Sequence, residues 1–187
     1  CDSQRKVSPG RATVAMILNG LGFTNRRLYL THQFFLSISI ERLLGPDLEA
    51  KDITDYTLGH ALDDIAEYGS SKLFAEVAFG IAIDNNLLEN ENHLDTTSIL
   101  VHGAYEVNDD PKTIEVARGF SKDHRPDLKQ IVLSLVVNGS SSIPLWIDPL
   151  DGNSSDKTSF HETIKKVEDF RAEIDVDGKF KWIADAA

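Results

Sequence analysis

The stretch KQIVLSLVVN, residues 129–138, decides the fold class of this chain. Two apolar triplets, at 131–133 and 135–137, flank a single serine and form a nearly continuous apolar run. A short run of this kind, bounded by polar residues, is typical of a β-strand that is buried on both faces. The Asn138-Gly139 pair and the serines that follow it predict a turn back into another strand.

Downstream of this run, the pattern predicts a strand, a helix and a final strand. Residues 143–150 form the next strand, and Pro144 and Pro149 place it at a sheet edge or a bulge. A helix begins at Ser155 or Asp156 and continues to about residue 171, with one apolar stripe. Residues 180–183 form the last strand.

Upstream, residues 94–101 predict the first strand, and residues 105–107 a short partner. The polar residues 84–93 before them are interpreted as a linker. A three-strand meander, a crossover helix and a fourth strand form the opening half of a ribonuclease-H-like fold, in which the first and fourth strands lie side by side. Other α/β domains share this element order, so the order alone leaves them open.

The front of the chain is helical in pattern, from about residue 12 to residue 86. Apolar residues repeat at helical spacing after residue 14, again from Asn25 to Gly45-Pro46, and again from Thr54 to Tyr68. Gly69 ends the third helix and Ser70 begins a fourth. The predicted organisation is therefore a helical domain at 1–90 followed by an incomplete ribonuclease-H-like mixed sheet at 91–187, an α+β or α/β chain.

Composition restricts the function classes. The chain has 187 residues, 41% hydrophobic content and a formal net charge of −11. A run of eighteen apolar residues is lacking, so no membrane span is expected, and the single cysteine suits a reducing cytoplasm. The acidic balance argues against simple DNA binding, which rests on Lys and Arg neutralising phosphates. A DNA-related function must therefore come from motifs.

One motif is highly specific. The block SKDHRPDLKQ, residues 121–130, resembles a block of DDE-class insertion-sequence transposases, and three further segments follow that family's order. LDTTS at 94–98 is similar to the segment with the first catalytic aspartate, DGNSSD at 151–156 to the turn into the crossover helix, and WIADAA at 182–187 to the strand end with the second aspartate. The resemblance covers nearly the whole chain, including the helical front.

The resemblance implies metal-dependent phosphodiester hydrolysis and strand transfer on DNA. It assigns Asp95 and Asp185 as catalytic residues and as ligands of Mg²⁺ or Mn²⁺. The family also uses a glutamate on a later helix, which these 187 residues lack. We therefore expect a transposase fragment, truncated after the second aspartate, in which the cation is held weakly and activity is lost.

The same resemblance leaves several alternatives open. Lys122, His124 and Arg125 are candidate DNA contacts, although His124 and Arg125 would equally suit a hydrogen-bonded turn, and Arg125 would suit a pair with a nearby carboxylate. Asp95 could be a plain strand residue, and Asp185 a solvated one. The expected partner is DNA at the terminal inverted repeats of the element, with self-association or pairing with full-length transposase. The alternative function is a non-catalytic DNA-binding or transposase-interacting module.

Overall fold

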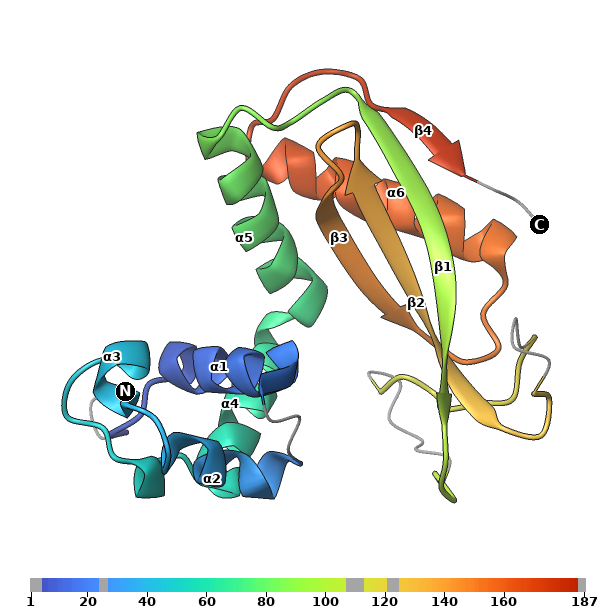
Figure 1. Cartoon of the computed structure of the whole chain (residues 1–187). Coiled ribbons are helices and arrows are strands. Elements are labelled where there is room, and N and C mark those ends of the chain that lie inside the picture. Colours follow the sequence, from blue (N-terminus) through green and yellow to red (C-terminus); the bar gives the residue numbers. More distant parts are fainter. Residues whose placement is uncertain (1–4, 24–26, 107–112, 121–124, 185–187) are drawn as a thin grey trace. The chain divides into compact units, whose positions relative to one another are not determined.

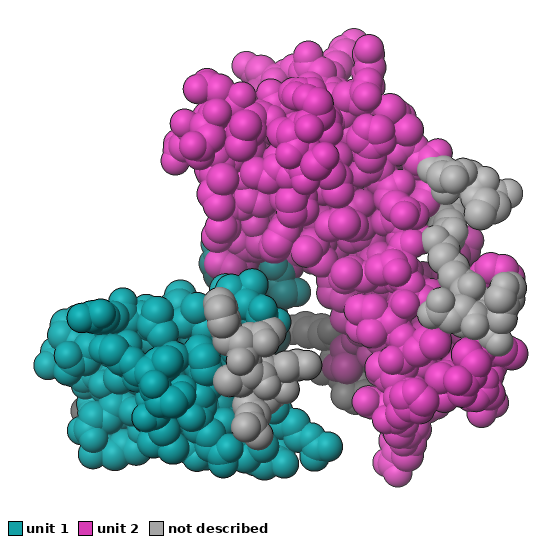
Figure 2. All heavy atoms as spheres, in the orientation of Figure 1, with its two compact units in different colours: residues 1–70 teal, residues 71–187 magenta. Residues whose placement is uncertain are grey.

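The computed structural model describes residues 5–23, 27–106, 113–120 and 125–184. Contacts divide the chain into two compact units, residues 1–70 and residues 71–187 (Figure 2). The change from helical to strand pattern predicts a boundary at residue 90, whereas the contacts divide the chain at Ser70. In the described residues, no helix has the length and apolar character needed to cross a membrane.

The first unit is helical. Its elements are α1 (Pro9–Leu18), the π-helical turn η1 (Asn19–Phe23), the 3₁₀ turn η2 (Leu28–Leu30), α2 (Thr31–Phe35), α3 (Ile40–Leu44), the 3₁₀ turn η3 (Ala50–Asp52) and α4 (Asp55–Tyr68). Ser8 caps α1, because its side chain accepts a hydrogen bond from the amide of Arg11. The core of the unit gathers buried residues from all parts of it, among them Ala15, Phe35, Ile53 and Leu58.

The predictions for this unit are confirmed in part. Helix α4 starts after Thr54, whose side chain accepts from the amide of Thr57, and it ends at Gly69, where φ is 104°. The helix predicted between Asn25 and Gly45 is wrong, because α2 and α3 are separate short helices. Between them, the Ser37 hydroxyl donates to the carbonyl oxygen of Phe34, a local bond of the kind that competes with helix continuation.

The second unit combines two helices with a mixed sheet (Figure 1). Its elements are α5 (Ser70–Asp84), β1 (Glu91–Val101), β2 (Lys129–Asn138), β3 (Ile143–Leu150), α6 (Asp156–Glu173) and β4 (Lys181–Ala184). The strand order is β3-β2-β1-β4. β2 pairs antiparallel with β1 and β3, and β4 pairs parallel with β1. The predicted fold class is thereby confirmed, because a helical front precedes a mixed four-stranded sheet that is compatible with a ribonuclease-H-like core.

The core of this unit lies on one face of the sheet, where α5 and α6 pack against β1, β2 and β3. Its members include Ala75, Phe79, Leu94, Val136, Trp146, Val167 and Phe170. The Phe170 ring contacts the rings of both Phe79 and Trp146. The two helices are therefore joined to the sheet through one aromatic cluster.

Burial along β2 alternates, contrary to the prediction that it is buried on both faces. Gln130, Val132, Ser134, Val136 and Asn138 are fully buried, whereas the residues between them are half-buried. The reason is that α5 and α6 both cover the same face. The apolar run therefore packs under helices on one side only.

Element boundaries also differ from the predictions at three places. β1 begins at Glu91, so the last residues of the predicted linker belong to the strand. Tyr105 and Glu106 are not in a strand, and Val107 lies outside the described residues. β4 runs one residue later than predicted, and a bulge lies in the β2–β3 pairing between Val136 and Val137. The bulge accords with the prediction that proline-containing β3 is at an edge or irregular.

Candidate functional site on the open face of the sheet

The predicted aspartate Asp95 lies in the middle of β1. Its Cα is paired with that of Leu135 on β2. On its other side, β1 pairs in parallel with β4, and the last described pair of that ladder is Leu94 with Ala184. Asp185 follows Ala184 in sequence and lies outside the described residues.

Asp95 points away from the helix-covered face. Leu94 and Thr96 are buried, whereas His93, Asp95 and Thr97 are exposed, as expected for alternation along a strand. The amide of Thr96 donates to Asp95 Oδ1 at 2.7 Å. The carboxylate therefore stands on the open face of the sheet, on the strand that pairs with β4.

An ionisable row follows the same face of β1. Glu91, His93 and Asp95 alternate with inward residues, and His93 Nε2 lies 3.7 Å from Glu91 Oε1. Glu91 is paired across the parallel ladder with Lys181. The open face of β1 thus begins with a mixed-charge group and continues to Asp95 and Thr97.

The carboxylate chemistry of this face fits a hard divalent cation in kind, because Mg²⁺ prefers oxygen ligands. The number of ligands on this face is too small, since in the described part of the chain no group of three or more His, Cys, Asp or Glu side chains could hold a metal ion. A metal at Asp95 therefore remains a hypothesis, and the described residues define no reaction step through it.

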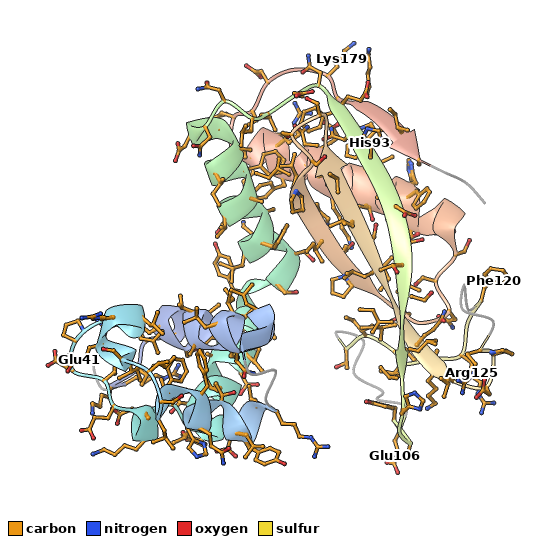
Figure 3. The ribbon with its side chains drawn as sticks, in the orientation of Figure 1. Glu41, His93, Glu106, Phe120, Arg125 and Lys179 are labelled. Atoms are coloured by element: carbon orange, nitrogen blue, oxygen red, sulfur yellow. The ribbon has the colours of Figure 1, made fainter. Side chains whose placement is uncertain are left out.

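Arg125 lies far from Asp95. Lys129 is paired with Val101 at the end of β1, so Arg125 precedes β2 beyond that end. Val101 lies six positions after Asp95, about 20 Å along a strand. Figure 3 shows Arg125 at the end of the sheet away from His93. The structure thus does not bring Arg125 together with Asp95, and the other two candidate DNA contacts, Lys122 and His124, lie outside the described residues.

The Arg125 side chain forms a two-pronged ion pair with Asp127. Nε donates to Asp127 Oδ1 at 2.8 Å and Nη2 to Oδ2 at 2.7 Å. Hydrogen bonding from Arg125 lowers the pKa of Asp127 to about 2, and the pKa of Arg125 is raised for the same reason. The carboxylate pairing that the sequence left open for Arg125 is therefore present.

The segments that carry the family resemblance meet at Gln130, a residue to which the sequence assigned no role of its own. Its buried side chain donates from Nε2 to the carbonyl oxygen of Gly152 at 2.8 Å. The amide of Gly152 donates to the carbonyl oxygen of Glu115, and the Glu115 amide donates to the Asp151 side chain. Ala117 forms an isolated antiparallel bridge with Gln130. The 151–156 turn, the 113–120 segment and the start of β2 thus form one hydrogen-bonded junction.

Comparison with known proteins adds a match at the front of the chain. Residues 1–79 match a family described as "Domain of unknown function (DUF4277)". This match covers the helical unit and reaches into α5, and it spans less than half of the chain. No curated protein matches the chain.

A solved structure described as "Mos1 transposase paired-end complex with left transposon end" aligns with 9% sequence identity and a TM-score of 0.33. The alignment covers 100% of this chain and 54% of that chain, so this chain spans about half the length of that transposase. At this TM-score, the likeness supports no conclusion about function.

Proposed function

We propose that this chain is part of an insertion-sequence transposase of the DDE class, which breaks and joins phosphodiester bonds of DNA. The supporting observation is the parallel ladder between β1 and β4, which runs to Leu94 and Ala184. The next residue in each strand segment is an aspartate, Asp95 or Asp185. A ribonuclease-H-like active site requires carboxylates on these two neighbouring strands, and the SKDHRPDLKQ block resembles that of the same family.

In this proposal, Asp95 and Asp185 are ligands of Mg²⁺ or Mn²⁺. The cation would supply Lewis-acid activation of a water or 3′-hydroxyl and stabilise the leaving oxygen. Asp95 is suited to this role because it is exposed and lies on the strand next to β4. Two carboxylates bind one hard cation weakly and do not fix two, so we expect the 187-residue polypeptide alone to be inactive.

A titration with Mn²⁺ tests the metal site. We expect the full chain to bind Mn²⁺ weakly, as followed by the loss of the free-ion electron paramagnetic resonance signal. Asp95→Asn should abolish this binding. Asp169→Asn, an exposed position on α6 with the same change in charge, should leave it unchanged. Equal binding by wild type and Asp95→Asn would rule out Asp95 as a ligand.

A nicking assay tests the expected lack of activity. Supercoiled DNA with Mg²⁺ or Mn²⁺ should stay supercoiled in the presence of the wild-type chain. If the wild type nicks and Asp95→Ala does not, the chain is catalytically competent. That result would contradict the expected inactivity and support Asp95 as a catalytic residue.

A non-catalytic module that binds DNA or full-length transposase is a second candidate. The separate compactness of residues 1–70 favours it, because a compact helical unit can bind without any catalytic chemistry. Gel shifts on terminal inverted repeats and co-purification with full-length transposase test it. Binding by the Asp95→Asn variant at the wild-type level would separate this function from catalysis.

A further inference from the structure

Helix α5 is apolar on two opposite sides. On its inner side, Ala75, Phe79 and Ala82 are buried and belong to the core of the sheet unit. On its outer side, Val77 is 57% exposed and Ile81 is 49% exposed. A helix that is hydrophobic on all sides is expected to be covered on all sides. The outer side of α5 is instead open to solvent in the described part of the chain.

The outer side of α5 carries one continuous seam of residues. Its members are spaced four, three, four and three residues apart, and all are at least partly exposed: Ser70, Phe74, Val77, Ile81 and Asp84. This alternating spacing keeps the side chains on one side of a helix, and it is the pattern by which two helices interlock their side chains. The three middle members are apolar, and the two end members are polar. These five residues are here named the outer seam.

The outer seam is complementary to a second copy of itself. When two copies of α5 cross antiparallel at the middle of the seam, Val77 of each copy faces Ile81 of the other. Every contact then occurs twice about a two-fold axis, which is the property of an isologous dimer interface. An unrelated helix would need its own apolar seam to fit, whereas a second copy always supplies one.

The charge at one end of the seam selects the antiparallel direction. Asp84 is the ionisable member of the outer seam. In a parallel pair, two Asp84 side chains would face each other, and such a meeting of like charges is unfavourable. In an antiparallel pair, Asp84 lies next to the first turn of the partner helix, where the positive end of the helix dipole favours a carboxylate.

We propose that the chain forms a symmetric dimer in which α5 packs antiparallel against α5 of a second copy through the outer seam. The proposal gives a surface and a direction to the self-association that the sequence left without a location. It goes beyond the proposed function, because the outer seam takes no part in metal binding or bond breakage and requires no DNA.

The size of the contact and the charge of the chain limit the strength of this dimer. α5 has 15 residues and is about 22 Å long. One pair of such helices buries less than the roughly 800 Å² per partner of a standard interface. The formal net charge of −11 on each copy also opposes association. We expect a dissociation constant on the order of 10 to 100 µM, which salt should lower by screening the repulsion.

Sedimentation equilibrium of the full chain, at concentrations that bracket this dissociation constant, tests the dimer. Val77→Lys should weaken it at least about tenfold, because a charge is placed in the middle of the apolar seam. This substitution makes the chain less acidic, so greater repulsion between copies cannot explain the loss. Ile83→Lys makes the same change in charge at a position on α5 that is 45% exposed and lies off the seam. It should change the dissociation constant less than about twofold.

Disulfide cross-linking in a Cys1→Ser background tests the direction. A mixture of Val77→Cys and Ile81→Cys chains should cross-link more than either variant alone, because these two positions face each other only in the antiparallel pair. Asp84→Asn should weaken an antiparallel dimer about threefold, whereas it would strengthen a parallel one. Asp169→Asn removes the same charge from an exposed position on α6 and corrects for the change in overall repulsion.

Each outcome decides the proposal. A wild-type chain that stays monomeric at every concentration would overturn it, and so would equal effects of Val77→Lys and Ile83→Lys with both variants folded by circular dichroism. If Val77→Lys does not fold, the milder change Ile81→Gln tests the same seam. Cross-links that form best between like positions would overturn the antiparallel arrangement. Asp95→Asn should dimerise as the wild type does, so a failure of the proposed metal site is separable from a failure of the dimer.

Discussion

The Gln130 side chain donates a hydrogen bond to the carbonyl oxygen of Gly152 at 2.8 Å. Gln130 is 1% exposed and ends the SKDHRPDLKQ block, and Gly152 belongs to the DGNSSD turn. Twenty-two residues apart in sequence, they form one junction with the backbone of Glu115 and Ala117. The two segments that carry the family resemblance thus have a shared structural role at the start of β2.

Gly152→Ala should disrupt this junction. A Cβ at Gly152 would lie 2.0 Å from the carbonyl oxygen of Gln130 and 2.6 Å from that of Ala117, so the backbone would have to move. We expect a loss of about 3 kcal/mol in the free energy of unfolding, measured with urea.

Gly80→Ala in α5 is the matched control. A Cβ there meets nothing within 4 Å, and alanine is the better helix former. This change should stabilise the chain by about 0.5 to 1 kcal/mol. If both substitutions lower the free energy of unfolding equally, the close backbone approach at Gly152 is not the cause of the loss.

Local signals predicted much of the fold. The helical run predicted from Thr54 to Tyr68 and the stop at Gly69 match α4 to within one residue, and the apolar run at 131–137 correctly indicated a strand, because each signal acts within a few residues. The prediction of one long second helix was wrong, because Ser37 forms a local side-chain bond to the backbone, which a periodicity pattern does not take into account. The burial of β2 on one face depends on where α5 and α6 pack, and no local sequence pattern predicts that packing.

The candidate site was predictable to a similar degree. The element order and the family resemblance together predicted that the first and fourth strands are neighbours, and the structure has β1 beside β4 with Asp95 on β1. A cavity of the helical unit could not be predicted, because tertiary packing brings Lys51 and Tyr56 to the segment with Arg5 and Lys6. Gln130 was missed because its partners lie far along the chain.

Asn138→Leu should weaken the start of β1. The Asn138 side chain accepts from the amide of Glu89 at 2.8 Å, and it donates to the carbonyl oxygen of Glu89 and the side-chain oxygen of Asn92. Leucine has a similar volume but leaves these groups without partners. We expect a loss of about 3 kcal/mol in unfolding free energy, since several polar groups are affected.

Asn153→Leu is the control, because it makes the same substitution at an exposed position outside the core. Its effect in urea unfolding should stay within about 0.5 kcal/mol. A loss at Asn138 no larger than at Asn153 would show that the buried amide network contributes nothing to stability.

The Arg125–Asp127 pair predicts a pH dependence. Because hydrogen bonding from Arg125 lowers the pKa of Asp127 from 3.8 to about 2, the pair stabilises the folded chain fully above pH 3.8. That contribution is lost as the pH falls through about 2. A carboxyl titration followed by nuclear magnetic resonance should give a midpoint near this lower value.

Arg125→Gln should raise the Asp127 midpoint toward 3.8, because the hydrogen bonds and the positive charge are removed. Lys129→Gln removes a charge two residues from Asp127 that does not contribute to the lowered pKa of Asp127, so it should leave the midpoint almost unchanged. An unaltered midpoint in Arg125→Gln would mean that the pair does not persist in solution.

Arg171→Met should release the segment between α6 and β4. The Arg171 side chain is 2% exposed, and its Nη2 donates to the carbonyl oxygens of Val176 and Gly178. Its guanidinium also lies 3.5 Å from the centre of the Phe180 ring. Methionine would fill much of the space but leave both carbonyl oxygens without a donor, at a cost of about 3 kcal/mol.

Hydrogen–deuterium exchange locates this effect. Peptides covering residues 174–184 should exchange faster in Arg171→Met, because the loop that leads into β4 is no longer held. Lys165→Met makes a comparable substitution at an exposed position on α6 and should leave exchange in these peptides unchanged. The proposed second metal ligand, Asp185, follows Ala184, the last residue of β4. If its position depends on β4, Arg171→Met should also weaken Mn²⁺ binding at Asp95. Unchanged exchange in β4 would show that Arg171 stabilises the end of α6 alone.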